Sequence, residues 1–154
     1  MTGNSRLPVL KRIQTLYGLV EQVHSLALVQ ASLAVREAEI AIARQCEQMR
    51  EARYGGREAL LGGDRERRAL TESQLELSGA RRQLLETVRL EREIRNDQAR
   101  EEYHLSRVKS EQMKSVVETI RTEEELIEGR RVQAASDDRF LSRLLWNKLR
   151  LEGI

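Results

Sequence analysis

Apolar residues in the first third of the chain recur at alternating spacings of three and four, the pattern of a helix that packs along one narrow seam. Between positions 26 and 35 they are denser than a two-helix seam needs, which predicts an additional contact there. We therefore expect a first helix over about residues 5–60. The predicted seam residues are Val9, Ile13, Leu16, Val20, Val23, Leu26, Leu33, Ile40 and Ala43.

A second heptad pattern begins after residue 65 and predicts a second, longer helix over about residues 65–150. A break in this helix near 129–136 is also possible. Gly129 weakens the helix there, and Ser136 followed by two aspartates is typical of a helix start. The predicted seam residues of this helix are Leu70, Leu77, Ala80, Leu84, Val88, Glu91, Met113, Val117, Ile120 and Ile127.

The positions of proline and glycine predict where the two helices meet. Pro8 is the one proline, and the first turn of a helix tolerates it because its missing N–H has no partner there. Inside a helix proline costs about 3 kcal/mol and glycine about 1 kcal/mol. The glycine pairs at 55–56 and 62–63 therefore mark a turn within 55–64, with Asp64 as the cap of the second helix. Asn4 or Ser5 is the expected cap of the first helix.

These signals predict one all-α domain over residues 1–154, a long antiparallel two-helix coiled-coil hairpin with a longer second helix. Folding at residues 62–63 places residue i opposite about residue 125 − i, so that Leu33 faces the neighbourhood of Arg92. The second helix outruns the first, and about 30 residues after Ile120 have no partner in the same chain.

Composition supports a narrow seam and no thick core, because 34% of the residues are charged and only 3% are aromatic. The net charge is only +2, and acidic and basic residues alternate closely, so no basic run free of acids is present to hold nucleic acid. The regular apolar spacing argues against disorder over most of the length. We expect a protein that binds other proteins and no nucleic acid.

The lone Cys46 excludes an intramolecular disulfide and fits a reducing compartment. No run of 18 apolar residues is present, and the N-terminus lacks the apolar stretch of a signal peptide. The sequence therefore predicts a cytoplasmic chain without a membrane span.

The sequence offers no set of residues for catalysis or for a metal. His24 and His104 come close in the predicted hairpin, but no cysteine or clustered acid completes a ligand set. Cys46 has no histidine near it to activate a nucleophile, and the Gly62-Gly63 turn lacks the Lys-Ser/Thr ending of a phosphate-binding loop. We expect no enzyme, no cofactor and no metal.

The C-terminal segment from Asp138 to Leu151 predicts an amphipathic helix with no partner in the chain. Its large apolar residues alternate with Arg139, Arg143, Lys148 and Arg150. Three interpretations are open: it docks in a groove of a partner protein, it folds back or self-associates to close a homodimer, or it lies on an anionic membrane. The apolar residues are Phe140, Leu141, Leu144, Leu145, Trp146 and Leu149.

Arginines gather near the predicted turn, among enough acidic residues to leave only a mild positive excess. This region is either a solvated helix end or a docking tip for an acidic partner surface. The arginines are Arg44, Arg50, Arg53, Arg57, Arg65, Arg67 and Arg68.

The layout of the chain resembles the stalk proteins of bacterial type III secretion, the flagellar FliJ and injectisome YscO-like family. The resemblance is carried by the helix–turn–longer helix order, the start Arg6-Leu-Pro-Val-Leu-Lys-Arg-Ile13 and the tail Asp137-Asp-Arg-Phe-Leu-Ser-Arg143. The tail departs from the family where it continues as Leu144-Leu-Trp-Asn-Lys-Leu149, which is more apolar than the charged ending expected there.

The resemblance implies a central stalk, compatible with a monomer, that enters the hexameric secretion ATPase and links it to the export-gate protein and to secretion chaperones. It would lie in the cytoplasm, peripheral to the inner membrane through the secretion apparatus. The end that carries both termini would enter the ring through Val9, Ile13, Phe140, Leu141, Arg143, Leu144, Leu145, Trp146 and Leu149. The turn would contact the gate through Arg50, Arg53, Tyr54 and Arg57. The alternative is a homodimeric coiled-coil adaptor or scaffold in which the second helices of two copies pair.

Overall fold

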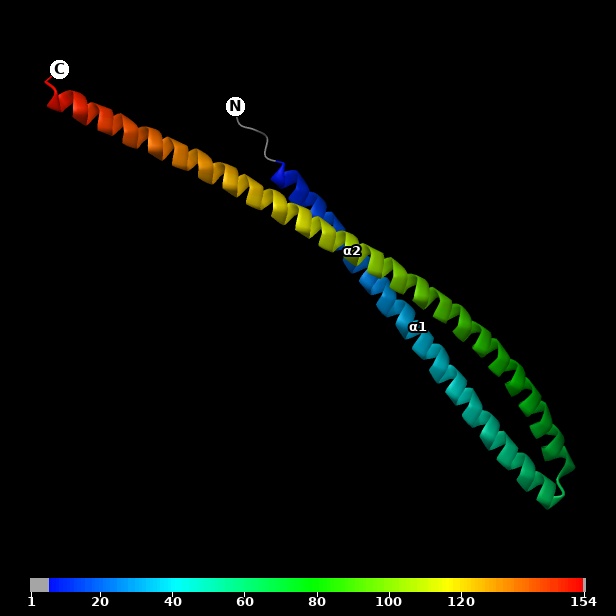
Figure 1. Ribbon diagram of the computed structural model, residues 1–154. Helices are drawn as coiled ribbons and strands as arrows, with labels where there is room; N and C mark the ends of the chain where they lie inside the picture. Colours follow the sequence, from blue (N-terminus) through cyan, green and yellow to red (C-terminus); the bar gives the residue numbers. More distant parts are fainter. Residues whose placement is uncertain (1–5, 154) are drawn as a thin grey trace. The chain divides into compact units, whose positions relative to one another are not determined.

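The computed structural model describes residues 6–153, and these form two helices, α1 (Leu7–Gly62) and α2 (Arg65–Leu151) (Figure 1). The helices pack against each other as a hairpin, and the described residues contain no strand. The predicted all-α hairpin with a longer second helix is confirmed. The expected caps Asn4 and Ser5 lie outside the described residues.

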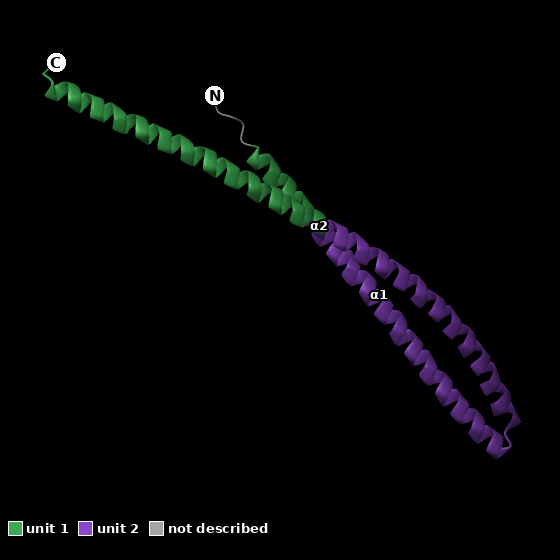
Figure 2. Cartoon of the chain, viewed as in Figure 1, with its two compact units in different colours: residues 1–18, 108–154 green, residues 19–107 purple. Residues whose placement is uncertain are grey.

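The chain divides into two compact units, each of which contains part of both helices (Figure 2). The first unit joins residues 1–18 to residues 108–154, and the second unit comprises residues 19–107 with the turn. Each unit is described by itself below.

The turn in the second unit is a Schellman motif centred on Gly63. The N–H of Asp64 donates to the carbonyl of Ala59 at 3.0 Å, and the N–H of Gly63 donates to the carbonyl of Leu60 at 3.4 Å. Gly63 has a φ of 70°, a left-handed conformation that glycine adopts without steric cost. The Asp64 carboxylate accepts from the N–H of Arg67 at 3.0 Å and caps α2. The turn lies within the predicted span, at its C-terminal end.

The glycine pair at 55–56 is helical and does not end α1. Gly56 lies where the two helices approach closely, because a Cβ added there would be 3.1 Å from Cγ2 of Thr71. The alternative break near 129–136 is absent as well, since α2 is helical from Arg65 to Leu151. Serine and aspartate fit inside this helix, and the Ser142 hydroxyl donates to the carbonyl of Asp138 at 2.7 Å.

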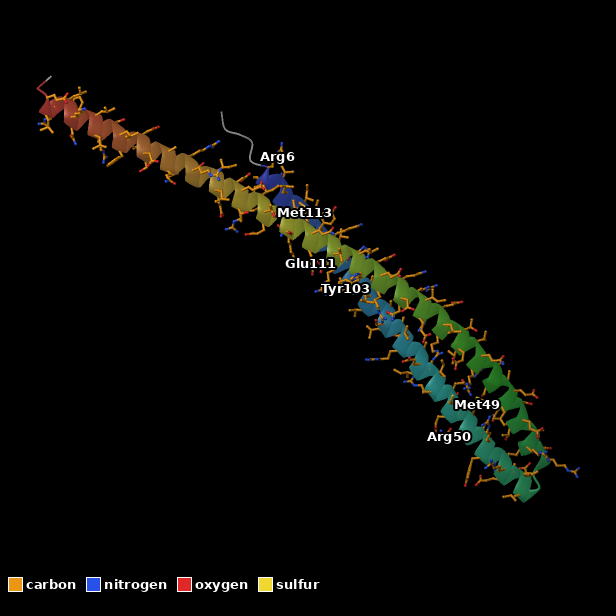
Figure 3. All side chains as sticks on the ribbon, in the orientation of Figure 1. Arg6, Met49, Arg50, Tyr103, Glu111 and Met113 are labelled. Atoms are coloured by element: carbon orange, nitrogen blue, oxygen red, sulfur yellow. The ribbon has the colours of Figure 1, made fainter. Side chains whose placement is uncertain are left out.

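The seam of the second unit follows a seven-residue repeat in each helix, interrupted in α2 only at Arg82, which is exposed. Its members are buried or half-buried, and most of them are small or polar. Met49, for example, is half-buried, whereas its neighbour Arg50 is exposed (Figure 3). In α1 the two sets are Glu21, Leu28, Val35, Ile42, Met49 and Gly56, and His24, Ala31, Ala38, Gln45, Ala52 and Ala59. In α2 they are Thr71, Ser78, Leu85, Arg92, Ala99 and Ser106, and Leu75, Arg89, Asn96 and Tyr103.

The predicted seam was wrong for most of its length. The large aliphatic residues chosen from the sequence are exposed on both helices. Each helix carries two heptad stripes on different faces, and apolar spacing alone does not tell which stripe meets the other helix. The exposed members are Val9, Leu16, Val20, Val23, Leu26, Leu33, Ile40, Ala43, Leu70, Leu77, Ala80, Leu84, Glu91 and Ile127. Ile13, Val88, Met113, Val117 and Ile120 are half-buried or buried.

The predicted register is confirmed to within four residues by contacts across the second unit. His24 Nδ1 lies 3.6 Å from a carboxylate oxygen of Glu102, whereas the predicted register, in which residue i faces about residue 125 − i, places residue 101 opposite residue 24. The Arg92 guanidinium donates to the carbonyl of Ala34 at 2.7 Å, and the Ser32 hydroxyl donates to the side-chain carbonyl of Asn96 at 3.0 Å. Polar side chains therefore contribute to the pairing of the two helices.

The last part of α2 lies in the first unit and has no covering side chains. Val117 is the last buried residue and Glu124 the last half-buried one, and every residue from 125 to 153 is exposed. We call residues 125–151 the C-terminal arm. The arm matches the predicted surplus of the second helix.

The seam assignment predicts opposite outcomes for two substitutions in the second unit. Ala38 is 2% exposed, so Ala38→Leu overfills the seam and destabilises the hairpin by about 1–3 kcal/mol. Leu77 is 61% exposed, so Leu77→Ala changes the free energy of unfolding by less than about 0.5 kcal/mol. Urea unfolding followed by the helical circular-dichroism signal measures both. A larger loss for Leu77→Ala would contradict the assigned seam.

Candidate interaction surfaces

The C-terminal arm presents an apolar face over its last turns. At 100° per residue, Leu141, Leu144 and Leu145 lie within about 100° of one another, with Phe140 at one edge of this face, Leu149 at the other edge, and Lys148 between Leu144 and Leu141. All five side chains are exposed, Phe140 at 63%. A helix with this much uncovered apolar surface on one side is suited to binding another protein.

Trp146 does not belong to that face. The helical period places it in a row with Arg139, Arg143 and Arg150, and it is 68% exposed. None of these three arginines forms an ion pair within residues 6–153, whereas Arg131, earlier in the arm, pairs with Glu128 at 3.8 Å. The arm therefore has an apolar face, on which Lys148 also lies, and an opposite face of three arginines and an aromatic ring.

The structure does not join Val9 and Ile13 to the apolar face of the arm. Val9 is exposed and Ile13 is half-buried near the start of α1 in the first unit. The arm residues from 125 onward lie beyond the part of α2 that other side chains cover. These residues form two separate surfaces in place of the single contact that the sequence predicted.

The four predicted turn residues share one face of α1 in the second unit, but they differ in their partners. Arg50 pairs with Glu47 at 3.1 Å within the helix. Tyr54 is exposed. Arg53 and Arg57, one helical turn apart, have no ion-pair partner among the described residues. The unpaired positive charge of this face therefore rests on Arg53 and Arg57.

Arg53 and Arg57 line a groove of about 270 Å³ between the two helices near the turn. Arg68 lines it too, but it is held by Glu72 at 3.1 Å. The groove is completed by Gly56, Leu60, Thr71, Glu72 and Leu75. The α2 side of this groove was not predicted from the sequence, although the predicted hairpin, in which residue i faces about residue 125 − i, places residue 68 opposite residue 57.

We call this space the arginine groove, and its chemistry fits a single carboxylate. Two unpaired guanidiniums, at Arg53 and Arg57, can bind a carboxylate through paired hydrogen bonds, while Leu60 and Leu75 offer apolar contact beside them. The neighbouring acids Glu47, Glu58 and Glu72 would repel an extended polyanion. An acidic side chain of a protein is therefore the favoured ligand.

Other polar features of the described residues do not form a site. His24 contacts Glu102, whereas His104 lines a different, open recess with Asp97 and Glu101. No group of three histidine, cysteine, aspartate or glutamate side chains within residues 6–153 could hold a metal. A hydrogen bond with the Glu125 carboxylate, together with the negative charges of Glu125 and Glu118, raises the pKa of Arg121, which stays protonated at physiological pH.

No helix in the described part of the chain is long and apolar enough to cross a membrane. No protein-family model matches the chain, and neither a curated protein nor a solved structure matches it. The resemblance to type III secretion stalk proteins therefore rests on the residues named in the sequence.

The exposure of the last part of the arm, residues 137–151, predicts that the hairpin folds without these residues. A chain that ends at Ser136 lacks residues 137–154, and residues 137–153 of these are all exposed. Its thermal unfolding midpoint should therefore stay within about 2 °C of that of the full chain. Thermal unfolding followed by circular dichroism measures this. A clearly lower midpoint would mean that the arm packs against the hairpin.

Proposed function

We propose that the chain is a non-enzymatic adaptor that acts as the central stalk of a bacterial type III secretion export apparatus. The arm is the observation that carries the proposal: residues 125–151 extend the second helix without cover and end in an apolar face. A hairpin with unequal helices is also the layout that the family resemblance implies. In this role the chain lies in the cytoplasm, next to the inner membrane.

The arm would bind the hexameric secretion ATPase. Phe140, Leu141, Leu144, Leu145 and Leu149 would pack into an apolar groove between ATPase helices, because large side chains on a helix face are typical anchors of such grooves. The row of Trp146 and three unpaired arginines would face acidic residues of the ring. Val9 and Ile13 would make a separate contact with the same ring.

The arginine groove would bind the export-gate protein. Arg53 and Arg57 are free to receive a carboxylate from the gate, and Tyr54 lies on the same face of α1. Secretion chaperones are a third class of partner under this proposal. One helix pair would thus serve two partners through surfaces of different chemistry.

A homodimeric adaptor is the second candidate. The observation that favours it is the set of leucines exposed seven residues apart on α2, namely Leu70, Leu77 and Leu84. A repeat of this kind is the seam of a further coiled-coil contact. In this alternative the second helices of two copies pair, and the chain needs no secretion ATPase.

Binding to the purified secretion ATPase tests the arm. Phe140→Ala with Leu144→Ala should weaken ATPase binding by about 100-fold, because two central apolar anchors are lost. The matched control, Leu126→Ala with Val132→Ala, removes exposed apolar residues from the arm outside its terminal face and should change binding by less than about threefold. Equal losses for both pairs, or no binding by the unmodified chain, would refute the ATPase contact.

Binding to the cytoplasmic part of the export-gate protein tests the arginine groove. Arg53→Gln with Arg57→Gln should weaken gate binding by about tenfold or more and make it less sensitive to salt, because two unpaired charges are lost. Arg50→Gln is the matched control, since Arg50 already pairs with Glu47, and should have little effect. A stronger effect of Arg50→Gln would move the contact away from the groove.

A further inference from the structure

The outer face of α1 in the second unit carries more exposed aliphatic surface than a folded helix pair needs. At 100° per residue, Leu26 and Leu33 lie about 160° around the helix from the seam formed by Leu28, Ala31 and Val35. Leu26 is 65% exposed, and four of the residues are spaced by seven. We call this set the leucine stripe: Leu19, Val23, Leu26, Val29, Leu33 and Ile40.

The leucine stripe lies on the least charged part of the chain. Residues 22–35 contain no aspartate, glutamate, lysine or arginine. Helices that pair with a helix of another sequence, and not with a copy of themselves, usually discriminate between the two through charges that flank the apolar seam. Arg36 and Glu37 flank the stripe near Leu33 and Ile40, whereas its part from Val23 to Val29 has no charged neighbour and can meet a copy of itself without like-charge repulsion.

The exposed leucines of α2 do not share this property. Leu70, Leu77 and Leu84 repeat every seven residues, but Glu76, Arg81 and other charged residues interrupt the segment between them. The outer faces of α1 and α2 therefore differ in their content of charged residues, although the individual leucines on them are similarly exposed. This difference selects α1 as the helix that associates with a second copy.

We propose that the leucine stripe is a self-association surface on which α1 of a second copy packs to form a two-fold dimer. Covering six half-exposed aliphatic side chains on each copy removes on the order of 1,000 Å² of surface from water, which is the lower bound for a specific interface. A two-fold contact is closed, because each stripe is covered by the other. The area fits a reversible dimer whose population depends on concentration.

This inference goes beyond the proposed function and does not rest on it. The contact ends at Ile40, so neither Arg53 nor any residue of the arm belongs to it. It also differs from the homodimeric alternative, in which α2 would pair with α2. Loss of the dimer and loss of partner binding are therefore separate outcomes of separate substitutions.

Sedimentation equilibrium of the full chain from about 5 to about 500 μM tests the proposal. The mass should rise from 17.8 kDa toward twice that value as the concentration increases. Leu26→Ala with Leu33→Ala should raise the dissociation constant by about 100-fold or more, because four apolar side chains leave the interface. Alanine is the best helix former, so the helical signal should be preserved.

Leu77→Ala with Leu84→Ala is the matched control, with the same residue types at the same spacing in the same unit, and it should leave the dissociation constant unchanged. Phe140→Ala with Leu144→Ala should leave it unchanged too. The proposal is overturned if the unmodified chain stays monomeric at every concentration, or if either control weakens the dimer as much as the Leu26 and Leu33 pair does. It is also overturned if that pair lowers the stability of the dilute chain more than Leu77→Ala with Leu84→Ala does, since the leucines would then belong to the inner seam.

Discussion

The tight turn at Gly63 and Asp64 is the constraint on which the rest of the second unit depends. Two residues join the helices, and the Schellman hydrogen bonds fix how each helix leaves the turn. The first facing residues, Ala59, Gly56 and Thr71, are small, so the helices approach closely there. Because the pattern repeats every seven residues, the face chosen at the turn stays inward along the unit.

Because this face points inward, the seam between the two helices contains mostly small and polar side chains, and many large apolar side chains lie on the outside of the hairpin. The buried members of the seam include Gln45 and Ser106, and the side-chain nitrogen of Gln45 finds no hydrogen-bond partner within the described chain. A buried group of this kind costs about 1–3 kcal/mol. Many large aliphatic residues, among them Leu26 and Leu77, remain outside, where they are available to other helices. A chain with this distribution is better suited to bind partners than to form a thick core.

Much of the fold could be predicted from the sequence, whereas the surfaces could be predicted only in part. The scarcity of proline, the glycine pair at 62–63 and the heptad spacing led to two helices, one turn and a register correct to within four residues. The arm followed from the unequal helix lengths. Its division into an apolar face and a Trp146 face could also have been derived, since it needs only the helical period. The α2 side of the arginine groove could have been predicted as well, because residue 57 lies opposite residue 68 when residue i faces about residue 125 − i.

Which residues are helical, where the chain turns and how far the second helix extends could all be predicted from the sequence, because these depend on local backbone preferences and chain length. Which of the two heptad stripes on each helix faces inward could be learned only from the packing of the two helices. Apolar content favours Leu26 and Leu77 for the seam, but the rotation of each helix is set at the turn, where small residues allow close approach. The same rotation brings Arg53 and Arg57 to the groove and leaves the leucine stripe outside.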